Sequence, residues 1–341
     1  MLFLIQDGIT NGAIYALLGL ALVLVFAVTR VILIPQGEFV TYGALSYAVL
    51  ATGKVPGTAW LAVVMGAVAF GFDLFAMRHS LHARKIGRSA ALNVVLPLAI
   101  LALTFSLASA TAPIAVSIAL ALLIVASIGL SLYRIAFQPL AHTSVLVLLI
   151  ASVGCHLALQ GLGLVFFGAE GLRGPALSTA AFNVGPLRFT GQNIAVYGVT
   201  IAFMIGLWLF FGTTLMGKAL RATAINRLGA RLVGIRTTLS GQIAFLLAAV
   251  IGAISGILIV PITTLYYDTG FLIGLKGFIA AIIGGLVSYP LTAVAALIVG
   301  TVESFSSFYA SNFKEVIVFF LIIPVLVLRS LAAPEVEEEK D

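Results

Sequence analysis

The sequence predicts an all-α membrane protein, a polytopic bundle of about 10–11 transmembrane segments, and three observations support this fold class. Of the 341 residues, 62% are hydrophobic and 9% are charged, whereas about a quarter of the residues in an average soluble domain are charged. The apolar residues also lie in long runs, and about 20 of them carry a helix across a hydrocarbon core of about 30 Å. Glycine is abundant, with 34 residues, and the spacing of Gly8 with Gly12 and of Gly252 with Gly256 lets helices pack closely.

Apolar runs define the predicted segments in order along the chain. The first eight are 8–28, 39–52, 57–77, 90–108, 113–133, 145–167, 194–213 and 239–260. Three shorter ones follow, 271–286, 291–305 and 316–331. The break at 288–290 (SYP) either separates two half-length helices or kinks one longer helix.

We expect a single transmembrane domain over residues 1–334, followed by an acidic tail over 335–341. The first run has no basic leader and no small-residue cleavage site, so we expect it to remain as a span. No linker divides the chain, and no internal repeat is evident.

Two basic loops, 78–88 and 218–236, predict the orientation in the membrane. Both are expected in the cytoplasm, which requires an even number of spans between them, and four runs lie there. The loop 168–192 and the N-terminus are then expected outside. With eleven segments the acidic tail lies inside, which we favour.

Several kinds of chemistry are missing from the sequence. No P-loop motif is present, so we expect the chain to hydrolyse no ATP itself. The four histidines show no metal-ligand spacing, no nucleophile motif lies beside a base, and the single Cys155 excludes an internal disulfide. We therefore expect no catalytic residues, no metal and no cofactor. The net charge of +6 is spread over short loops, so no nucleic acid partner is expected.

Carboxylates at membrane depth are informative because each is costly to insert. Asp73 lies late in its predicted span, five residues before Arg78, where its side chain can reach the basic loop. Glu38 either faces a water-filled cavity or interacts with a helix N-terminus. Glu303 either takes part in transport or forms a structural hydrogen bond. Glu38 and Glu303 are therefore candidates for a translocation path.

The segment 217–236 is basic and unusually rich in small residues. A short basic helix with small side chains can dock closely into a groove on a soluble partner and transmit force, and the alternative is an ordinary cytoplasmic loop. The residues that we expect to contact such a partner are Gly217, Lys218, Arg221, Ala224, Gly229, Ala230 and Gly234.

Several motifs resemble those of the permease subunits of branched-chain amino acid ABC transporters, the Liv permease family. They are 12–17 (GAIYAL) followed by Gly19, Gly37-Glu38 with Gly43, 133–140 (YRIAFQPL), the segment 217–235, 274–286 (GLKGFIAAIIGGL) and Glu303-Ser304. The likeness runs nearly end to end. Gln36 stands where the family usually has a histidine, and about 72–111 looks like an insertion relative to shorter members.

The resemblance implies a permease of the bacterial inner membrane. It would pair with a second, different permease subunit, two cytoplasmic ATPases and a periplasmic substrate-binding protein, with membrane lipid around it. The segment 217–236 would couple it to the ATPases, and no step would be catalysed by the chain itself. The translocation path would comprise Tyr15, Gln36, Gly37, Glu38, Gly284, Gly285 and Glu303.

Alternatives remain open at this point. An ion-coupled secondary transporter needs a titratable group inside the bundle, and Asp73 or Glu303 would have to serve. A membrane enzyme acting on a lipid needs a cluster of His, Asp or Arg, which the sequence does not show. The same importer type carrying urea, amides or aromatic acids is a further alternative to branched-chain amino acids.

Overall fold

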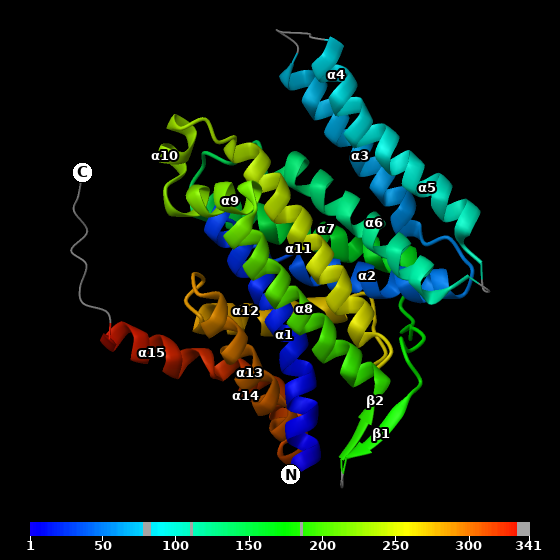
Figure 1. The fold of residues 1–341 in the computed structure, drawn as a ribbon, viewed down its shortest axis with the longest axis vertical. Helices are drawn as coiled ribbons and strands as arrows, with labels where there is room; N and C mark the ends of the chain where they lie inside the picture. The colour runs from blue at the N-terminus through cyan, green and yellow to red at the C-terminus, as the bar shows by residue number, and fades with distance from the viewer. Residues whose placement is uncertain (78–82, 110–111, 185–186, 333–341) are drawn as a thin grey trace.

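The protein is built almost wholly of helices (Figure 1), and its computed structural model describes residues 1–77, 83–109, 112–184 and 187–332. Eight stretches of the described chain are long and apolar enough to cross a membrane. They are α1 (Leu2–Thr29), α3 (Gly57–Ala76), Ile86–Leu107, Ile114–Phe137, α7 (Val145–Phe167), α8 (Gly191–Thr213), α11 (Thr237–Ile259) and α13 (Tyr289–Tyr309). This confirms the predicted polytopic all-α fold.

Two of these stretches contain a π-helical turn, and the remaining elements are short. The stretch Ile86–Leu107 comprises most of α4 (Ala83–Ala90), the π turn η1 (Ala91–Val95) and α5 (Leu96–Leu107), and Ile114–Phe137 comprises α6 (Ile114–Leu132) and the π turn η2 (Tyr133–Phe137). The shorter elements are α2 (Gln36–Ala51), α9 (Leu215–Ile225), α10 (Arg227–Leu232), α12 (Thr269–Ile283), η3 (Ser311–Phe313), α14 (Lys314–Phe320), α15 (Ile322–Ala332) and the hairpin β1 (Ala181–Val184) and β2 (Leu187–Thr190).

Helix starts follow from local sequence. Pro35, Pro56 and Pro113 stand immediately before α2, α3 and α6, where a missing N–H is tolerated. The hydroxyl of Thr214 accepts a hydrogen bond from the Gly217 N–H at the start of α9 (2.9 Å). Such caps satisfy backbone donors that have no partner inside the helix.

The C-terminal third differs from the prediction in two places. The segment predicted as 291–305 is α13, a full-length helix of 21 residues, so the expectation that it is short was wrong. Ser288 caps α13 and Pro290 lies in its first turn, so the break separates the short α12 from a complete span. The segment predicted as 316–331 is divided at Leu321 into α14 and α15.

The centre of the bundle is α1, which is buried along most of its length and runs between α13, α11 and α12 (Figure 1). Gly8 and Gly12 lie directly against Gly300 of α13, so a methyl group at these positions would collide with backbone atoms. Gly256 of α11 packs in the same way against the Val40 backbone of α2, and Gly252 packs against the side chains of Phe39 and Gln36. The predicted role of the paired glycines in close helix packing is confirmed.

The two short helices α2 and α12 meet inside the bundle at their first turns. A Cβ built on Gly37 would stand 2.5 Å from the carbonyl oxygen of Gly270, and Gly274 lies against the Gly37 backbone as well. The Thr41 hydroxyl accepts from the Gly270 N–H at 3.1 Å. Only glycine allows this approach of two backbones.

A polar network joins the margin of the bundle to α6. Asn93 lies on η1 and Arg134 on η2, and the guanidinium of Arg134 donates to the Asn93 side-chain oxygen. Arg134 is also 3.7 Å from Asp73, which accepts from Ser89 and Asn93. In the structure the Asp73 carboxylate therefore interacts with Ser89, Asn93 and Arg134. The sequence predicted that Asp73 reaches the basic loop at Arg78, and Arg78 lies outside the described residues. The predicted insertion at 72–111 covers α4 and α5 at this margin (Figure 1) and stays a prediction.

Replacing Arg134 with methionine is expected to lower the free energy of unfolding by about 2 kcal/mol, because hydrogen bonds to charged groups contribute roughly 1.5–3 kcal/mol. Thermal unfolding in detergent measures this. Arg236→Met is the control, since Arg236 is exposed and forms no ion pair among the described residues. Equal melting temperatures for the two variants would contradict the prediction.

The loops predicted on one side of the membrane lie together. Gln6 donates to the carbonyl oxygen of Arg188 (2.9 Å), which places the start of α1 beside the β1–β2 hairpin (Figure 1). At the other end, Arg227 donates to the Ala141 carbonyl oxygen (2.9 Å). The arrangement agrees with the predicted orientation, which itself stays a prediction. Residues 78–82 of the predicted basic loop and the acidic tail 335–341 lie outside the described residues.

Candidate functional site

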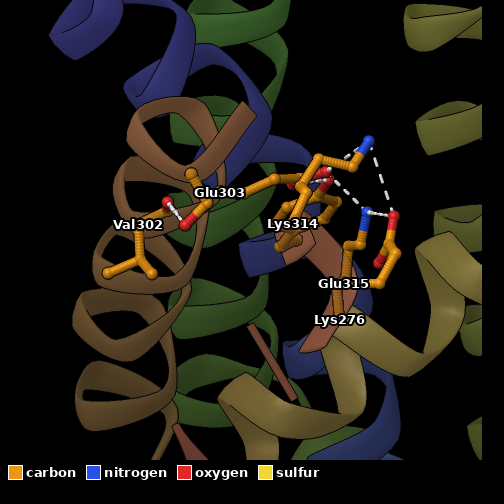
Figure 2. A network of polar contacts seen from close by, with 7 residues as sticks. Lys276, Val302, Glu303, Lys314 and Glu315 are labelled. Carbon is orange, nitrogen blue, oxygen red and sulfur yellow. Dashed lines mark hydrogen bonds and ion pairs between the residues drawn. The ribbon is translucent and has the colours of Figure 1, made fainter. Parts of the chain in front are cut away.

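Five side chains from four helices form a charged cluster inside the bundle (Figure 2). Lys276 of α12 bonds Glu303 of α13 (2.5 Å) and Glu315 of α14 (3.2 Å). Tyr15 of α1 donates its hydroxyl to the second oxygen of Glu303. Lys314 lies 3.9 Å from Glu303 and 3.5 Å from Glu315.

The cluster is buried at its inner end and open at its outer end. The side chains of Lys276 and Glu303 are 5% and 7% exposed, whereas those of Lys314 and Glu315 are 34% and 35% exposed. A buried charge requires a partner and satisfied hydrogen bonds, because its desolvation costs several kcal/mol. Two lysines and two glutamates balance each other here.

The cluster lines a cavity of about 650 Å³ that follows α1 from Leu4 and Asp7 to Tyr15. Leu4 and Tyr15 are eleven positions apart in the helix, a rise of about 16 Å, so the cavity leads from the predicted outer end of α1 to the middle of the span. Apolar side chains share its wall with the charged groups: Leu4, Ile259, Ile262, Leu272, Ile273 and Phe308. The cavity therefore combines both signs of charge with apolar surface.

Such a site suits a small solute that carries both charges and an apolar side chain. Ammonium groups bind carboxylates and carboxylates bind ammonium groups through strong, short hydrogen bonds. Across the described ranges, no group of three or more His, Cys, Asp or Glu side chains could hold a metal ion.

The structure brings together two of the predicted path residues, Tyr15 and Glu303, and places the others elsewhere. Glu38 is fully buried, and its carboxyl group forms a hydrogen bond with Nδ1 of His156 of α7 (2.8 Å), whose ring stacks on Phe271 (4.3 Å). The Gln36 amide donates to the Ala248 carbonyl oxygen (3.0 Å). These two side chains and Gly37 lie at the junction of α2 with α12.

Gly284 and Gly285 directly follow α12. Gly284 packs against Thr292 of α13, and Gly285 has φ of +80°, which favours glycine. Neither glycine lines the cavity with Tyr15 and Glu303. They end the helix and allow the chain to turn into α13.

Sequence reasoning did not assign Lys276, Lys314 and Glu315 to the site. A signal for Lys276 was present, because a lysine within an apolar helix of a membrane protein indicates a function or a buried partner. The prediction considered carboxylates alone at membrane depth. Lys314 and Glu315 open a short helix, and only the fold shows that it turns back towards Lys276.

The segment predicted to contact a soluble partner consists of two helices, α9 and α10, and the expectation of one short helix was wrong. Asn226 separates them, because its side-chain oxygen accepts from the Gly229 N–H (2.8 Å) and caps α10. Gly217 and Ala230 are buried against the chain's own helices, and Gly234 has φ of +86°. Lys218 and Arg221 are exposed, whereas Ala224 and Gly229 are half-buried.

The surface of this segment carries large apolar side chains that the sequence prediction did not single out. Those more than two-thirds exposed are Leu215, Ile225, Leu228, Leu232 and Val233. We call these five residues with Lys218 and Arg221 the α9–α10 surface.

Burial lowers the pKa of the neighbouring Arg227 guanidinium from its usual value, while the charge of Tyr133 opposes this shift. The hydrogen bond from Arg227 to Ala141 anchors α10 to the loop before α7.

Comparison with known families decides what kind of protein carries this site. A family model described as the permease component of the branched-chain amino acid transport system matches residues 4–326. The chain belongs to this family. The predicted resemblance is confirmed, and the permease is a multi-pass membrane transport protein rather than an enzyme.

Relatives resemble the permease over nearly its whole length. It is 26% identical to the high-affinity branched-chain amino acid transport system permease protein LivH of Salmonella typhimurium and to that of Escherichia coli, over 349 residues that cover 97% of this chain and 96% of each relative. It is 29% identical to the corresponding protein BraD of Pseudomonas aeruginosa over 227 residues, 64% of this chain and 74% of the relative. No solved structure matches the permease.

Proposed function

We propose that the permease is one of two membrane-spanning subunits of an ATP-driven importer for branched-chain or other hydrophobic amino acids in a bacterial inner membrane. A second, different permease subunit completes the path, two cytoplasmic ATPases supply energy, and a periplasmic binding protein delivers the substrate. The printed functions of LivH and BraD support the substrate class. The observation that carries the proposal is the charged cluster at the inner end of the cavity.

Substrate recognition follows from the charges and walls of this cavity. An amino acid is a zwitterion, so its carboxylate pairs with Lys276 or Lys314 and its ammonium group with Glu315 or Glu303. A branched apolar side chain then packs against wall residues such as Leu272. Substrate binding competes with the ion pairs inside the cluster, so the cluster rearranges as substrate passes.

The α9–α10 surface is the proposed contact with an ATPase. Its exposed apolar side chains and flanking positive charges have the composition of an interface that is covered in the assembled transporter. Closure of the ATPases on ATP would push this surface and shift α8 and α11, which flank it in the chain. Alternating access of the cavity to the two sides follows from that movement.

The variant Leu228→Asp/Leu232→Asp is expected to weaken binding of the ATPase by about fivefold or more, corresponding to about 1 kcal/mol or more. Both side chains are exposed, at 69% and 81%, so the fold itself should tolerate the change. Copurification of the ATPase encoded with this permease, after mild detergent extraction, measures the effect.

The matched control replaces an exposed leucine outside the α9–α10 surface with aspartate. Leu331, 79% exposed near the C-terminal end of α15, serves this purpose. Leu331→Asp should retain the ATPase at the wild-type level. Full retention by the Leu228→Asp/Leu232→Asp variant would remove this surface from the proposal.

Uptake of radiolabelled leucine by cells that express the complete transporter and lack their own leucine uptake tests the substrate class. We expect saturable uptake that excess isoleucine and valine inhibit and that excess urea does not. Inhibition by urea or amides with none by valine would show the same importer type with a neutral polar substrate. Inhibition by aromatic acids that lack an ammonium group would show that the acidic members of the cluster do not select substrate.

A further inference from the structure

Two adjoining pockets at the predicted cytoplasmic end have complementary linings. The first, about 390 Å³, lies between the end of α1, α9 and the turn after α12, and Arg30 and Arg221 line it. The second, about 280 Å³, lies between α1, α8 and α13 and is lined by apolar side chains that include Leu20, Met204 and Trp208. Arg221, Phe211 and Tyr289 line both pockets.

The shared residues separate the first pocket, which both arginines line among mostly apolar side chains, from the second, which Arg221 alone of the two arginines lines. The rings of Phe211 and Tyr289 lie 5.6 Å apart, and Arg221 faces both sides of this pair. No Asp or Glu of the described chain lines either pocket. Arg30 and Arg221 are exposed and form no ion pair among the residues that the structure describes. Two positive charges therefore have no carboxylate partner in the part of the chain that the structure describes.

The apolar pocket opens on the lipid-facing side of the bundle. Met204 and Trp208 of α8 are 36% and 73% exposed, and α8 is one of the helices with the length and composition of a membrane span. Trp208 and Tyr289 line this pocket together with Arg221, and aromatic and basic residues are typical of a membrane–water interface. A ligand that fills both pockets must have an apolar chain and an anionic head.

We propose that these pockets bind one anionic phospholipid of the cytoplasmic leaflet. Its phosphate lies between Arg30 and Arg221, and an acyl chain lies in the groove of α1, α8 and α13. Basic pockets between transmembrane helices on the cytoplasmic side bind such headgroups, and that leaflet carries anionic lipid. The lipid occupies the joint between α1 and α9, so it sets the resting position of the first helix of the α9–α10 surface.

Native mass spectrometry of the delipidated full-length chain tests the proposal. The chain is incubated with phosphatidylglycerol or, separately, with phosphatidylcholine of the same acyl chains. We expect a single retained phosphatidylglycerol and at least about fivefold less phosphatidylcholine, since each arginine near the surface contributes on the order of fivefold to binding. Equal retention of the two lipids overturns the proposal.

Variants assign the binding to this place. Arg221→Gln is expected to reduce phosphatidylglycerol retention about fivefold, and Arg30→Asn/Arg221→Gln about 25-fold. Asparagine is chosen because Arg30 has φ of +62°, a conformation that asparagine tolerates. Arg236→Gln, which removes an exposed arginine of the same loop outside both pockets, should bind as wild type. Equal loss in Arg221→Gln and Arg236→Gln overturns the proposal.

Two further measurements complete the test. The first distinguishes loss of positive charge from misfolding, and the second distinguishes a site for a lipid from a site for free phosphate. Arg221→Lys keeps the charge and should retain phosphatidylglycerol, so loss in this variant as well would count against the site. Excess glycerol 3-phosphate carries the anionic head without a chain. We expect it to leave the lipid bound, and full displacement by it would show a phosphate site instead of a lipid site.

Discussion

Lys276→Met is expected to abolish amino acid uptake and to lower the free energy of unfolding by about 3–5 kcal/mol, the range for removing one partner of a buried ion pair. Lys276 bonds both glutamates of the cluster, so its loss leaves Glu303 with Tyr15 and with Lys314 at 3.9 Å. Thermal unfolding in detergent and uptake of radiolabelled leucine measure the two effects.

A double variant separates the structural role of the pair from its role in transport. Lys276→Met/Glu303→Gln removes both buried charges and retains an acceptor for the Tyr15 hydroxyl. Replacing both partners of a buried pair is often neutral for stability, so this variant should unfold near the wild-type temperature. It should still transport no leucine, and recovery of uptake would show that the cluster only supports the fold.

The second large effect concerns the contact between the two short helices. Gly37→Ala is expected to destabilise the protein at the upper end of the roughly 1–3 kcal/mol range for overpacking. The new methyl group would meet the carbonyl group of Gly270 and the Cα of Phe271, which are backbone atoms that cannot rotate away. Thermal unfolding of the purified variant measures the loss.

Gly154→Ala is the matched control for this prediction. Gly154 lies on an exposed face of the apolar helix α7, and a Cβ there would meet nothing within 4 Å. In the interior of a helix, alanine is more stabilising than glycine by roughly 0.5–1 kcal/mol, so this variant should be at least as stable as wild type. A Gly37→Ala protein that matches the control in stability would disprove the close contact of α2 with α12.

The helices could be predicted from the sequence because the membrane demands a local property, a long apolar run. Gly8–Gly12 and Gly252–Gly256 also marked real close contacts, since small-residue spacing is visible within one helix. The length of α13 was underestimated because Ser306 and Ser307 end the apolar run, whereas the helix continues to Tyr309. Ser306 is buried in the bundle, one turn after Glu303.

The site could be predicted only in part, because it depends on contacts between distant segments. Tyr15 and Glu303 are separated by 288 positions, and no local pattern joins them. Lys276 was overlooked although its apolar surroundings marked it. Glu38 was identified as unusual, yet its partner His156 lies 118 positions away, and only the packing of α7 against α2 brings the two together.

The most direct test of the account is uptake by the reconstituted transporter. The tagged permease is copurified with its partners and placed in vesicles, with ATP on the side of the α9–α10 surface and the binding protein on the other. The account predicts two ATPases and a second permease in the complex, and leucine uptake that requires ATP. A lone permease that transports leucine without ATP would contradict it.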